Sequence, residues 1–294
     1  MSDELLGKIR QITICGVGLI GGSLGLALKK AGFAGRVVGF GRPVTLEKAQ
    51  RRGAIDSGAS NLAEAVADAD VVYLATPILT ILELLGKLPP LVKAEALITD
   101  AGSTKAVICE RGAALFPGPP WFVGGHPMAG KETTGVDSAD ADLLQGARYA
   151  LTPYSRHQLD VPVARSFVAW LDRIGARVLI LDAELHDEIV TWTSHLPQLV
   201  STALAVAVME NVKMPEDLEL SAGGLRDASR LADSAYNVWR DVCFTNAENL
   251  DRALNTFVQA LDHLRDNLRS RELEQIFERA NELRRRLKSP ALVE

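Results

Sequence analysis

Residues 11–31 have the sequence QITICGVGLIGGSLGLALKKA. The first five of these residues are mostly apolar or β-branched, and they predict a strand. Glycines with G-x-G-x-x-G spacing follow directly, and an apolar helical pattern begins near Ser23. In such a unit the first glycine permits a tight turn, the second lets a pyrophosphate approach the backbone, and the third lets the helix pack against the strand. The stretch therefore predicts a dinucleotide site formed by Gly16, Gly18, Leu19, Ile20 and Gly21.

Short apolar strands alternate with helical patterns throughout the first half of the chain. This alternation is typical of an α/β fold with a mainly parallel sheet that is covered by helices on both faces. The predicted strands are Gln11–Cys15, Arg36–Phe40, Asp70–Ala75, Ala96–Thr99, Trp121–Gly124, Arg148–Thr152 and Arg177–Leu181. From Ala183 onward the pattern predicts helices only, over residues 183–211, 216–232, 235–267 and 270–287. We therefore expect a dinucleotide-binding domain over residues 1–181 and an all-helical domain over 182–294.

Composition excludes several classes of protein. The 294 residues include 32 Lys and Arg against 37 Asp and Glu, a formal net charge of −5, which argues against binding to nucleic acid. The longest apolar stretch, Leu196 to Met209, contains polar residues and is too short to cross a bilayer, so no membrane association is expected. Because that helix is apolar on most sides, we expect it to be buried centrally or against a partner subunit, as in a homodimer.

Cysteine usage points to a reducing compartment. The three cysteines, at positions 15, 109 and 243, form no C-x-x-C pair and no closely spaced even set. This spacing predicts neither a disulfide framework nor a metal site. The N-terminal residues carry charges ahead of any apolar run, unlike a secretory signal. We therefore expect a cytoplasmic protein.

The end of the second strand favours NADP over NAD. NAD-specific sites usually place an acidic residue there to bind the ribose hydroxyls, whereas this chain has Gly41 followed by Arg42. An arginine can bind a 2′-phosphate bidentately. The alternative is that Arg42 is a surface residue and that NAD binds through other contacts. Thr76 and Pro77 follow the next long strand, at the edge where parallel sheets bind their ligands, and are further candidates for the cofactor site.

His126 is the principal candidate for catalysis. It follows a predicted strand within Gly124-Gly125-His126-Pro127, at the sheet edge where the cofactor is expected. A histidine in this position suits a general base that works near neutral pH. The alternative is a turn histidine that only caps backbone groups. Ser103, at the end of a neighbouring strand, is expected to hydrogen-bond His126 and to set its tautomer.

His195 and Thr191 are one helical turn apart. Pro197 cannot donate a hydrogen bond to the Thr193 carbonyl, so the helix is expected to kink beside them. The pair predicts either a polar substrate-binding patch at this kink or a core histidine whose hydrogen bonds are satisfied. The remaining histidines, at positions 157, 186 and 263, have no supporting neighbours in the sequence and are interpreted as surface residues.

Two arginines, Arg226 and Arg230, are spaced to share one face of a helix. Guanidinium groups bind carboxylates bidentately, so the pair suits a dicarboxylate substrate. A solvated helix face, with Asp227 and Asp233 as ion partners, explains the spacing equally well.

Four motifs in order give the chain a clear resemblance to a known family. GVGLIGGS at 16–23, GHPMAG at 125–130, SHLP at 194–197 and GLRDASR at 224–230 resemble the prephenate/arogenate dehydrogenases of tyrosine biosynthesis, over about residues 8 to 287. The GHPMAG and SHLP elements are specific, whereas the glycine motif alone is not. The resemblance implies a Rossmann-type domain followed by a helical dimerisation domain. It also implies an NAD(P)-dependent dehydrogenase that converts prephenate to 4-hydroxyphenylpyruvate.

The resemblance also implies roles for single residues. His126 matches the histidine that accepts the proton of the substrate ring hydroxyl, and Ser103 matches the serine that hydrogen-bonds that histidine. Arg230 matches an arginine that binds a substrate carboxylate, with Arg226 a weaker candidate, and His195 and Thr191 match a helix that lines the substrate pocket. Glu132 follows Lys131, where many relatives have a small hydroxyl residue. It is expected either to favour the ammonium group of arogenate or to be an interface residue. A β-hydroxyacid dehydrogenase remains a further alternative, although Lys213 lacks the surroundings of that family's catalytic lysine.

Overall fold

The computed structural model describes residues 6–131 and 133–288. Contacts within the chain divide it into two units, residues 1–247 and 248–294, which are described separately. The first unit contains the sheet, its covering helices and the first helices of the C-terminal half. The second unit consists of most of α12 (Ala247–Asp266) and of α13 (Glu272–Leu287).

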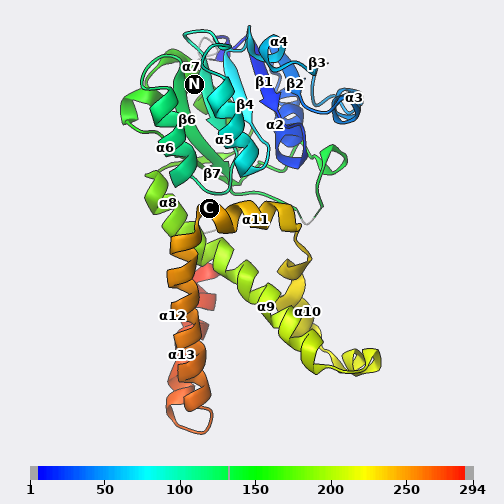
Figure 1. Ribbon diagram of the computed structural model, residues 1–294, viewed down its shortest axis with the longest axis vertical. Coiled ribbons are helices and arrows are strands. Elements are labelled where there is room, and N and C mark those ends of the chain that lie inside the picture. The colour runs from blue at the N-terminus through cyan, green and yellow to red at the C-terminus, as the bar shows by residue number, and fades with distance from the viewer. Residues whose placement is uncertain (1–5, 132, 289–294) are drawn as a thin grey trace. The chain divides into compact units, whose positions relative to one another are not determined.

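One eight-stranded sheet organises the first unit (Figure 1). Its order is β3-β2-β1-β4-β5-β6-β7-β8, and the strands from β3 to β6 are all parallel. β7 runs antiparallel to β6, and β8 runs parallel to β7. The strands are β1 (Gln11–Cys15), β2 (Arg36–Phe40), β3 (Ser57–Ala59), β4 (Val71–Leu74), β5 (Leu97–Asp100), β6 (Trp121–Pro127), β7 (Arg148–Thr152) and β8 (Arg177–Ile180).

Helices bury both faces of the sheet, which explains why β1, β4 and β5 are buried along their whole length. On one face Ile12 and Ile14 pack with residues of α2 and α7, and on the other Cys15 and Leu74 pack with residues of α5 and α6. The helices of this region are α2 (Leu19–Lys30), α3 (Pro43–Arg51), α4 (Leu62–Val66), α5 (Ile78–Lys87), α6 (Ala106–Leu115) and α7 (Pro162–Arg173). The expected α/β fold of Rossmann type is therefore confirmed, with β3 as a short edge strand that the sequence pattern did not predict.

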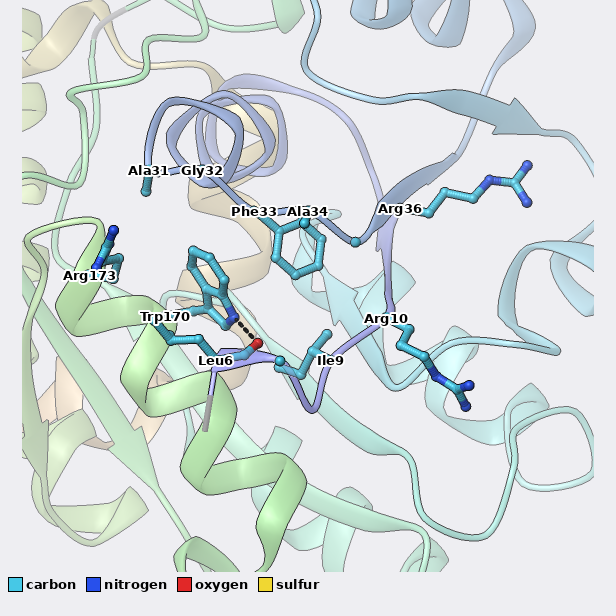
Figure 2. Close-up of a pocket in the computed structure, with 12 residues that line it drawn as sticks. Leu6, Ile9, Arg10, Ala31, Gly32, Phe33, Ala34, Arg36, Trp170 and Arg173 are labelled. Carbon is cyan, nitrogen blue, oxygen red and sulfur yellow. Dashed lines mark hydrogen bonds between the residues drawn. The ribbon is translucent and has the colours of Figure 1, made fainter. Parts of the chain in front are cut away.

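The amino ends of β1 and β2 are fastened to α7 by an aromatic contact (Figure 2). The rings of Phe33 and Trp170 meet edge to face with their centroids 5.1 Å apart, and Trp170 Nε1 donates a hydrogen bond of 3.1 Å to the Leu6 carbonyl. A pocket of about 580 Å³ lies beside them, with Arg10 and Arg36 among its lining residues. This pocket is at the opposite edge of the sheet from the glycine turn, whose residues follow the carboxyl end of β1.

Helices and turns alone follow β8 in the described part of the chain, as the sequence predicted. The predicted helix over 183–211 is interrupted, because a five-residue π-helical segment, Thr191–His195, separates α8 (Ala183–Val190) from α9 (Leu196–Asn211). Pro197, which has no N–H to donate to the preceding turn, lies in the first turn of α9 directly after this π-helical segment. The elements that follow are two short 3₁₀ turns (Pro215–Leu220 and Arg230–Asp233), α10 (Gly223–Ser229) and α11 (Tyr236–Thr245). Among residues 6–131 and 133–288, no helix is long and apolar enough to cross a membrane.

Candidate active site

The glycine turn after β1 has the geometry that a dinucleotide site requires. Gly16 has a φ of 94°, and a Cβ built on it would lie 2.6 Å from the Ala75 carbonyl oxygen. A Cβ on Gly21 would lie 2.2 Å from the Gly16 carbonyl oxygen, so any side chain there would force α2 away from the turn. Space is open beside Gly18, where no atom lies within 4 Å of such a Cβ. The helix begins at Leu19 and not near Ser23, because the N-cap is Gly18, and no side chain caps its first turn.

A cleft of about 1050 Å³ opens over this turn. Of the predicted cofactor residues, the cleft brings together Gly16, Gly18, Arg42, Thr76 and Pro77. Leu19, Ile20 and Gly21 do not line it and instead form the first turn of α2. The Thr76 hydroxyl is buried without a hydrogen-bond partner among the described residues. An unsatisfied hydroxyl, open space at Gly18 and an uncapped helix N-terminus together fit a bound dinucleotide.

The part of the cleft near β2 carries positive charge. Arg42 is exposed, precedes α3, and its guanidinium makes no hydrogen bond or ion pair with the described residues. Lys48 also lines the cleft and pairs at 2.6 Å with Asp137, another lining residue, which neutralises that carboxylate. A free guanidinium at the end of β2 fits an anionic group better than a ribose hydroxyl pair.

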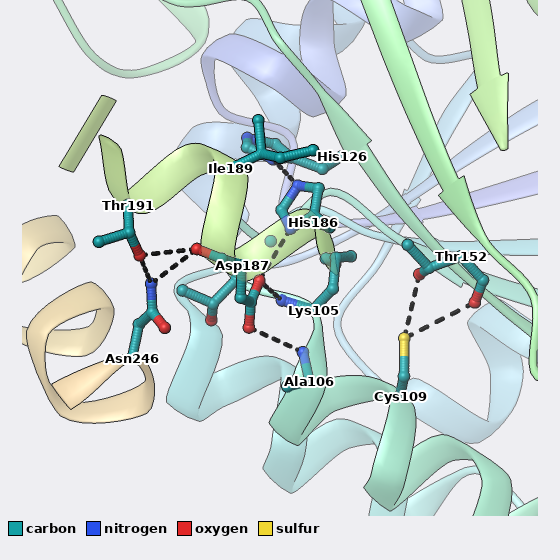
Figure 3. A network of polar contacts seen from close by, with 12 residues as sticks. Lys105, Ala106, Cys109, His126, Thr152, His186, Asp187, Ile189, Thr191 and Asn246 are labelled. Carbon is teal, nitrogen blue, oxygen red and sulfur yellow. Dashed lines mark hydrogen bonds and ion pairs between the residues drawn. The ribbon is translucent and has the colours of Figure 1, made fainter. Parts of the chain in front are cut away.

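His126 lies within β6, two residues beyond the end that the sequence predicted. The strand continues to Pro127 because it pairs with β7, with His126 opposite Ala150. His126 Nδ1 lies 2.8 Å from Nε2 of His186 (Figure 3). Burial is the largest cause that holds the pKa of His126 well below its usual range, and the nearby charges of His186, Lys105 and His195 act in the same direction. At neutral pH His126 is therefore unprotonated and able to accept a proton.

The interpretation of His186 as a surface histidine is wrong. Its side chain is only 2% exposed, and its Nδ1 lies 2.8 Å from Oδ1 of Asp187, which is 1% exposed. Both residues belong to α8, which packs against α6 and β7. Figure 3 shows their side chains beside Lys105 and His126. Asp187 is followed at four-residue intervals by Thr191 and His195, and this polar stripe is the signal in the sequence that indicates a buried network here.

Asp187 anchors the network to the N-terminus of α6. Its Oδ1 accepts the backbone N–H of Lys105 at 2.7 Å, and its Oδ2 accepts that of Ala106 at 2.9 Å. These are N–H groups that α6 leaves without helical partners, so a carboxylate from α8 takes the role of an N-cap. An acidic side chain in this position lies at the positive end of the α6 dipole, which is a favourable placement.

A buried ion pair holds the residue that precedes His126. Lys105 and Asp100 are both fully buried and bonded to each other, and Lys105 Nζ also donates to the Gly125 carbonyl at 2.8 Å. Asp100 Oδ1 accepts the N–H of Gly125 at 3.0 Å, and its Oδ2 accepts the N–H of Gly102 at 2.8 Å. Both backbone groups of Gly125 are therefore fixed, and the backbone that carries His126 is fixed with them.

Ser103 does not make the contact expected of it. Across residues 6–131 and 133–288, no hydrogen bond joins Ser103 to His126, whose Nδ1 is bonded to His186 instead. Ser103 is half-buried in the loop between β5 and α6, at the same edge of the sheet as His126.

His195 and Thr191 are buried and share one hydrogen-bond donor. Asn246 Nδ2 donates to Thr191 Oγ1 at 2.8 Å and to His195 Nδ1 at 3.2 Å. His195 meets the edge of Trp239 with ring centroids 5.8 Å apart, and burial lowers the pKa of His195 to about 4. These contacts satisfy Nδ1 of His195, as the core interpretation of this pair expects.

No hydrogen bond or ion pair between described residues joins Arg226 or Arg230 to the histidine network. Arg226 lies in α10 and Arg230 opens the next 3₁₀ turn, so the single continuous helix that the sequence predicted ends between them. Both are exposed, and this segment is tied to α9 by a hydrogen bond of 2.6 Å from Gln198 Nε2 to the Leu231 carbonyl. Glu132 lies outside the described residues.

Comparison with known proteins identifies the family. The family model of the nucleotide-binding domain of prephenate dehydrogenase matches residues 24–180, and that of its dimerisation domain matches residues 182–282. The chain belongs to the prephenate dehydrogenase family. The resemblance that the four motifs gave is thereby confirmed, and so is the classification as an oxidoreductase.

Individual relatives of known name span most of the chain. The prephenate dehydrogenase of Lactococcus lactis is 35% identical over 94% of this chain and 77% of its own length. A crystal structure of prephenate dehydrogenase from A. aeolicus with hydroxyphenyl propionate and NAD⁺ superposes with a TM-score of 0.84, at 30% identity over 94% of this chain and 96% of that one. Synechocystis arogenate dehydrogenase superposes at 0.78, with 32% identity over 94% and 99% of the two chains. Members named for either substrate thus share this fold.

Proposed function

We propose that this protein oxidises prephenate to 4-hydroxyphenylpyruvate and carbon dioxide, with reduction of a nicotinamide cofactor. The observation that carries the proposal is the His126–His186–Asp187 network at the edge of the sheet where the glycine turn forms a dinucleotide cleft. Relatives named prephenate dehydrogenase support the choice of substrate. The β-hydroxyacid alternative requires a catalytic lysine in the helical region, and Lys213 is exposed beyond the end of α9.

Each part of the site has a role in the oxidative decarboxylation of prephenate. The bound cofactor supplies an acceptor for the hydride that leaves C4 of the ring. His126 takes the proton of the C4 hydroxyl, which lets the C–O bond become a carbonyl. That carbonyl accepts the electron pair released when the quaternary carbon loses carbon dioxide, and the ring becomes aromatic. We place Ser103 at the substrate side of His126, and Thr191 and His195 at the wall of the substrate pocket.

The cofactor that we propose is NADP, with NAD as the alternative. Gly16, Gly18, Leu19, Ile20 and Gly21 would hold the pyrophosphate, and Thr76 and Pro77 the adjoining part of the cofactor. The unpaired guanidinium of Arg42 supports a 2′-phosphate at the end of β2. The NAD⁺ in the A. aeolicus structure supports the alternative.

An absorbance assay that crosses two substrates with two cofactors tests these proposals. Prephenate and arogenate are each combined with NAD and NADP, and formation of the reduced nicotinamide is followed. We expect the highest kcat/KM with prephenate and NADP. Faster turnover of arogenate than of prephenate would identify arogenate as the substrate. It would also support a contact of Glu132 with the ammonium group of arogenate. An absence of turnover with all four pairs, in a folded protein, would refute the proposed reaction.

Arg230→Gln is expected to raise the KM for prephenate strongly while the KM for the cofactor stays unchanged. Glutamine cannot form the bidentate ion pair, and leaving a desolvated carboxylate unpaired costs about 2–5 kcal/mol, on the order of 30-fold or more in affinity. Steady-state kinetics with each substrate varied in turn measure the effect. Arg226→Gln is expected to have a smaller effect of the same kind, and Arg111→Gln, on the exposed side of α6, none. An Arg230→Gln variant that changed only the cofactor KM would contradict the assignment.

We further propose that the protein is a homodimer of the cytoplasm. The apolar helix α9 supports this, because most of it is not covered within the first unit. Val206 and Met209 are 52% and 69% exposed, although the helix was expected to be buried centrally or by a partner. The match to a dimerisation domain over residues 182–282 supports a second copy of the chain as that partner.

A further inference from the structure

We propose that His186 and Asp187 form a proton relay behind His126. The relay fixes which ring nitrogen of His126 carries the proton, and His186 receives the Nδ1 proton of His126 during the reaction. The inference rests on the proposed role of His126 as the general base. His186 is thereby a positioning and relay residue that acts on the substrate only through His126.

The hydrogen bonds of the network determine which nitrogen carries each proton. Asp187 faces three donors, the backbone N–H groups of Lys105 and Ala106 and the ring of His186, so its oxygens act as acceptors. His186 Nδ1 must therefore carry a proton, which in a neutral ring leaves Nε2 as an acceptor. Nε2 of His186 accepts from His126 Nδ1 at 2.8 Å. The Nε2 lone pair of His126 is thus left for the substrate.

Burial makes this order of donors and acceptors persistent. His186 and Asp187 are 2% and 1% exposed, so water does not compete for their hydrogen bonds. Asp187 is itself held by the N-terminus of α6 (Figure 3). Gly125, the residue before His126, is held by Lys105 and Asp100. Three elements that are distant in the sequence, β6, α6 and α8, therefore fix the line of three side chains.

The relay places the positive charge where the site can best accept it. When the substrate O–H bond breaks, its proton bonds to His126 Nε2, and the proton on His126 Nδ1 passes to His186 Nε2. His126 ends as a neutral ring with its proton on Nε2, and His186 ends as an imidazolium against the Asp187 carboxylate. Charge on His126 itself is disfavoured by burial and by the nearby Lys105 cation, whereas His186 lies directly against an anion. A two-histidine relay thus lets a weakly basic His126 take up a proton.

The first test reads the tautomer of His126 in the unaltered protein. Histidine labelled with ¹⁵N gives different ring-nitrogen shifts for Nδ1–H and Nε2–H forms, and the His126→Asn variant assigns the signals. We expect Nδ1–H on His126 at neutral pH. A His126 protonated at Nε2 would overturn the proposal. This measurement needs no substrate, so it remains decisive even if the protein turned over neither prephenate nor arogenate.

The second test separates the tautomer from the relay with two variants of His186. In His186→Gln the amide oxygen can occupy the place of Nε2 and accept from His126, but it cannot take up a proton. In His186→Leu both functions are lost. We expect His186→Gln to keep the Nδ1–H tautomer of His126 and to lower kcat on the order of 10- to 100-fold. In His186→Leu we expect His126 to lose this tautomer and kcat to fall further. His157→Gln, at an exposed histidine of the same domain, is the matched control and is expected to be unchanged.

Kinetics in mixtures of light and heavy water distinguish a relay from a structural role. Two protons in flight give a curved dependence of kcat on the deuterium fraction, and one gives a straight line. We expect a curve for the unaltered enzyme and a line for His186→Gln, each measured with saturating cofactor. Straight lines for both, or full activity of His186→Gln, would overturn the relay. If His186→Leu fails to fold, the His186→Gln variant and the spectra of the unaltered protein still decide.

Discussion

Replacing His126 with asparagine is expected to lower turnover by about 10²–10⁴-fold, which is the usual contribution of a general base. Asparagine is smaller and has no basic nitrogen, yet its amide N–H can still donate to His186 Nε2. The cleft over the glycine turn is formed by other residues, so equilibrium titration with reduced cofactor should give an unchanged affinity. The loss is therefore expected in kcat, measured with both substrates saturating.

The pH dependence of the unaltered enzyme carries an independent signature of the same base. A base must be neutral to act, so kcat/KM falls as the pH falls through its pKa. The pKa of His126 is lowered by burial and by the charges of His186, Lys105 and His195, which places the acidic limb below the ordinary histidine value of about 6.5. Turnover of His126→Asn within threefold of the unaltered enzyme, or an unchanged acidic limb in that variant, would contradict the assignment.

The sequence predicts the parts of the fold that depend on local chemistry. The bounds of β1, β2 and β7 agree with the predicted strands, because each is a short apolar or β-branched run with turn residues beside it. The glycine turn was equally predictable, since Gly16 and Gly21 meet backbone atoms that leave no room for a side chain. The strand β3 was not predicted, because Ser57-Gly58-Ala59 is short and has no large apolar side chain. Its small residues let Leu46 of α3 pack closely, and a Cβ on Gly58 would lie 2.8 Å from that of Leu46.

The candidate site was predicted only in part, because its central contacts join distant segments. His126 was found from its glycine-rich strand end, and Arg42 from its place after β2. The partner of His126 is 60 residues away in the sequence, and the anchor of Asp187 on Lys105 is 82 residues away. The polar stripe of Asp187, Thr191 and His195 is the only local signal for the network, and it does not include His186, whose burial depends on how α8 packs on α6. From the sequence, Ser103 was expected to be the hydrogen-bond partner of His126. In the fold the partner of His126 Nδ1 is His186.

Replacing Lys105 with methionine is expected to destabilise the protein by about 3–5 kcal/mol, the usual cost of removing one member of a buried ion pair. Methionine fills most of the volume but leaves the Asp100 carboxylate without its cation and the Gly125 carbonyl without a donor. The free energy of unfolding in urea, followed by circular dichroism, measures the loss. Since Gly125 precedes His126, the variant that remains folded should also turn over more slowly.

A paired substitution shows whether that loss of stability comes from the unpaired charge of Asp100. Asparagine at position 100 carries no charge and keeps one acceptor oxygen, for the N–H of either Gly102 or Gly125, at the cost of the other hydrogen bond. Because the unpaired buried charge is removed, the double variant Asp100→Asn/Lys105→Met should be more stable than Lys105→Met by at least ~1 kcal/mol. Lys29→Met is the matched control, because Lys29 and its partner Asp56 are 29% and 42% exposed. Its expected cost is at most ~1 kcal/mol. Equal losses of stability for Lys29→Met and Lys105→Met would show that the Lys105–Asp100 pair contributes no more than a surface contact. The position of Gly125 would then depend on the hydrogen bond from its N–H to the Asp100 carboxylate.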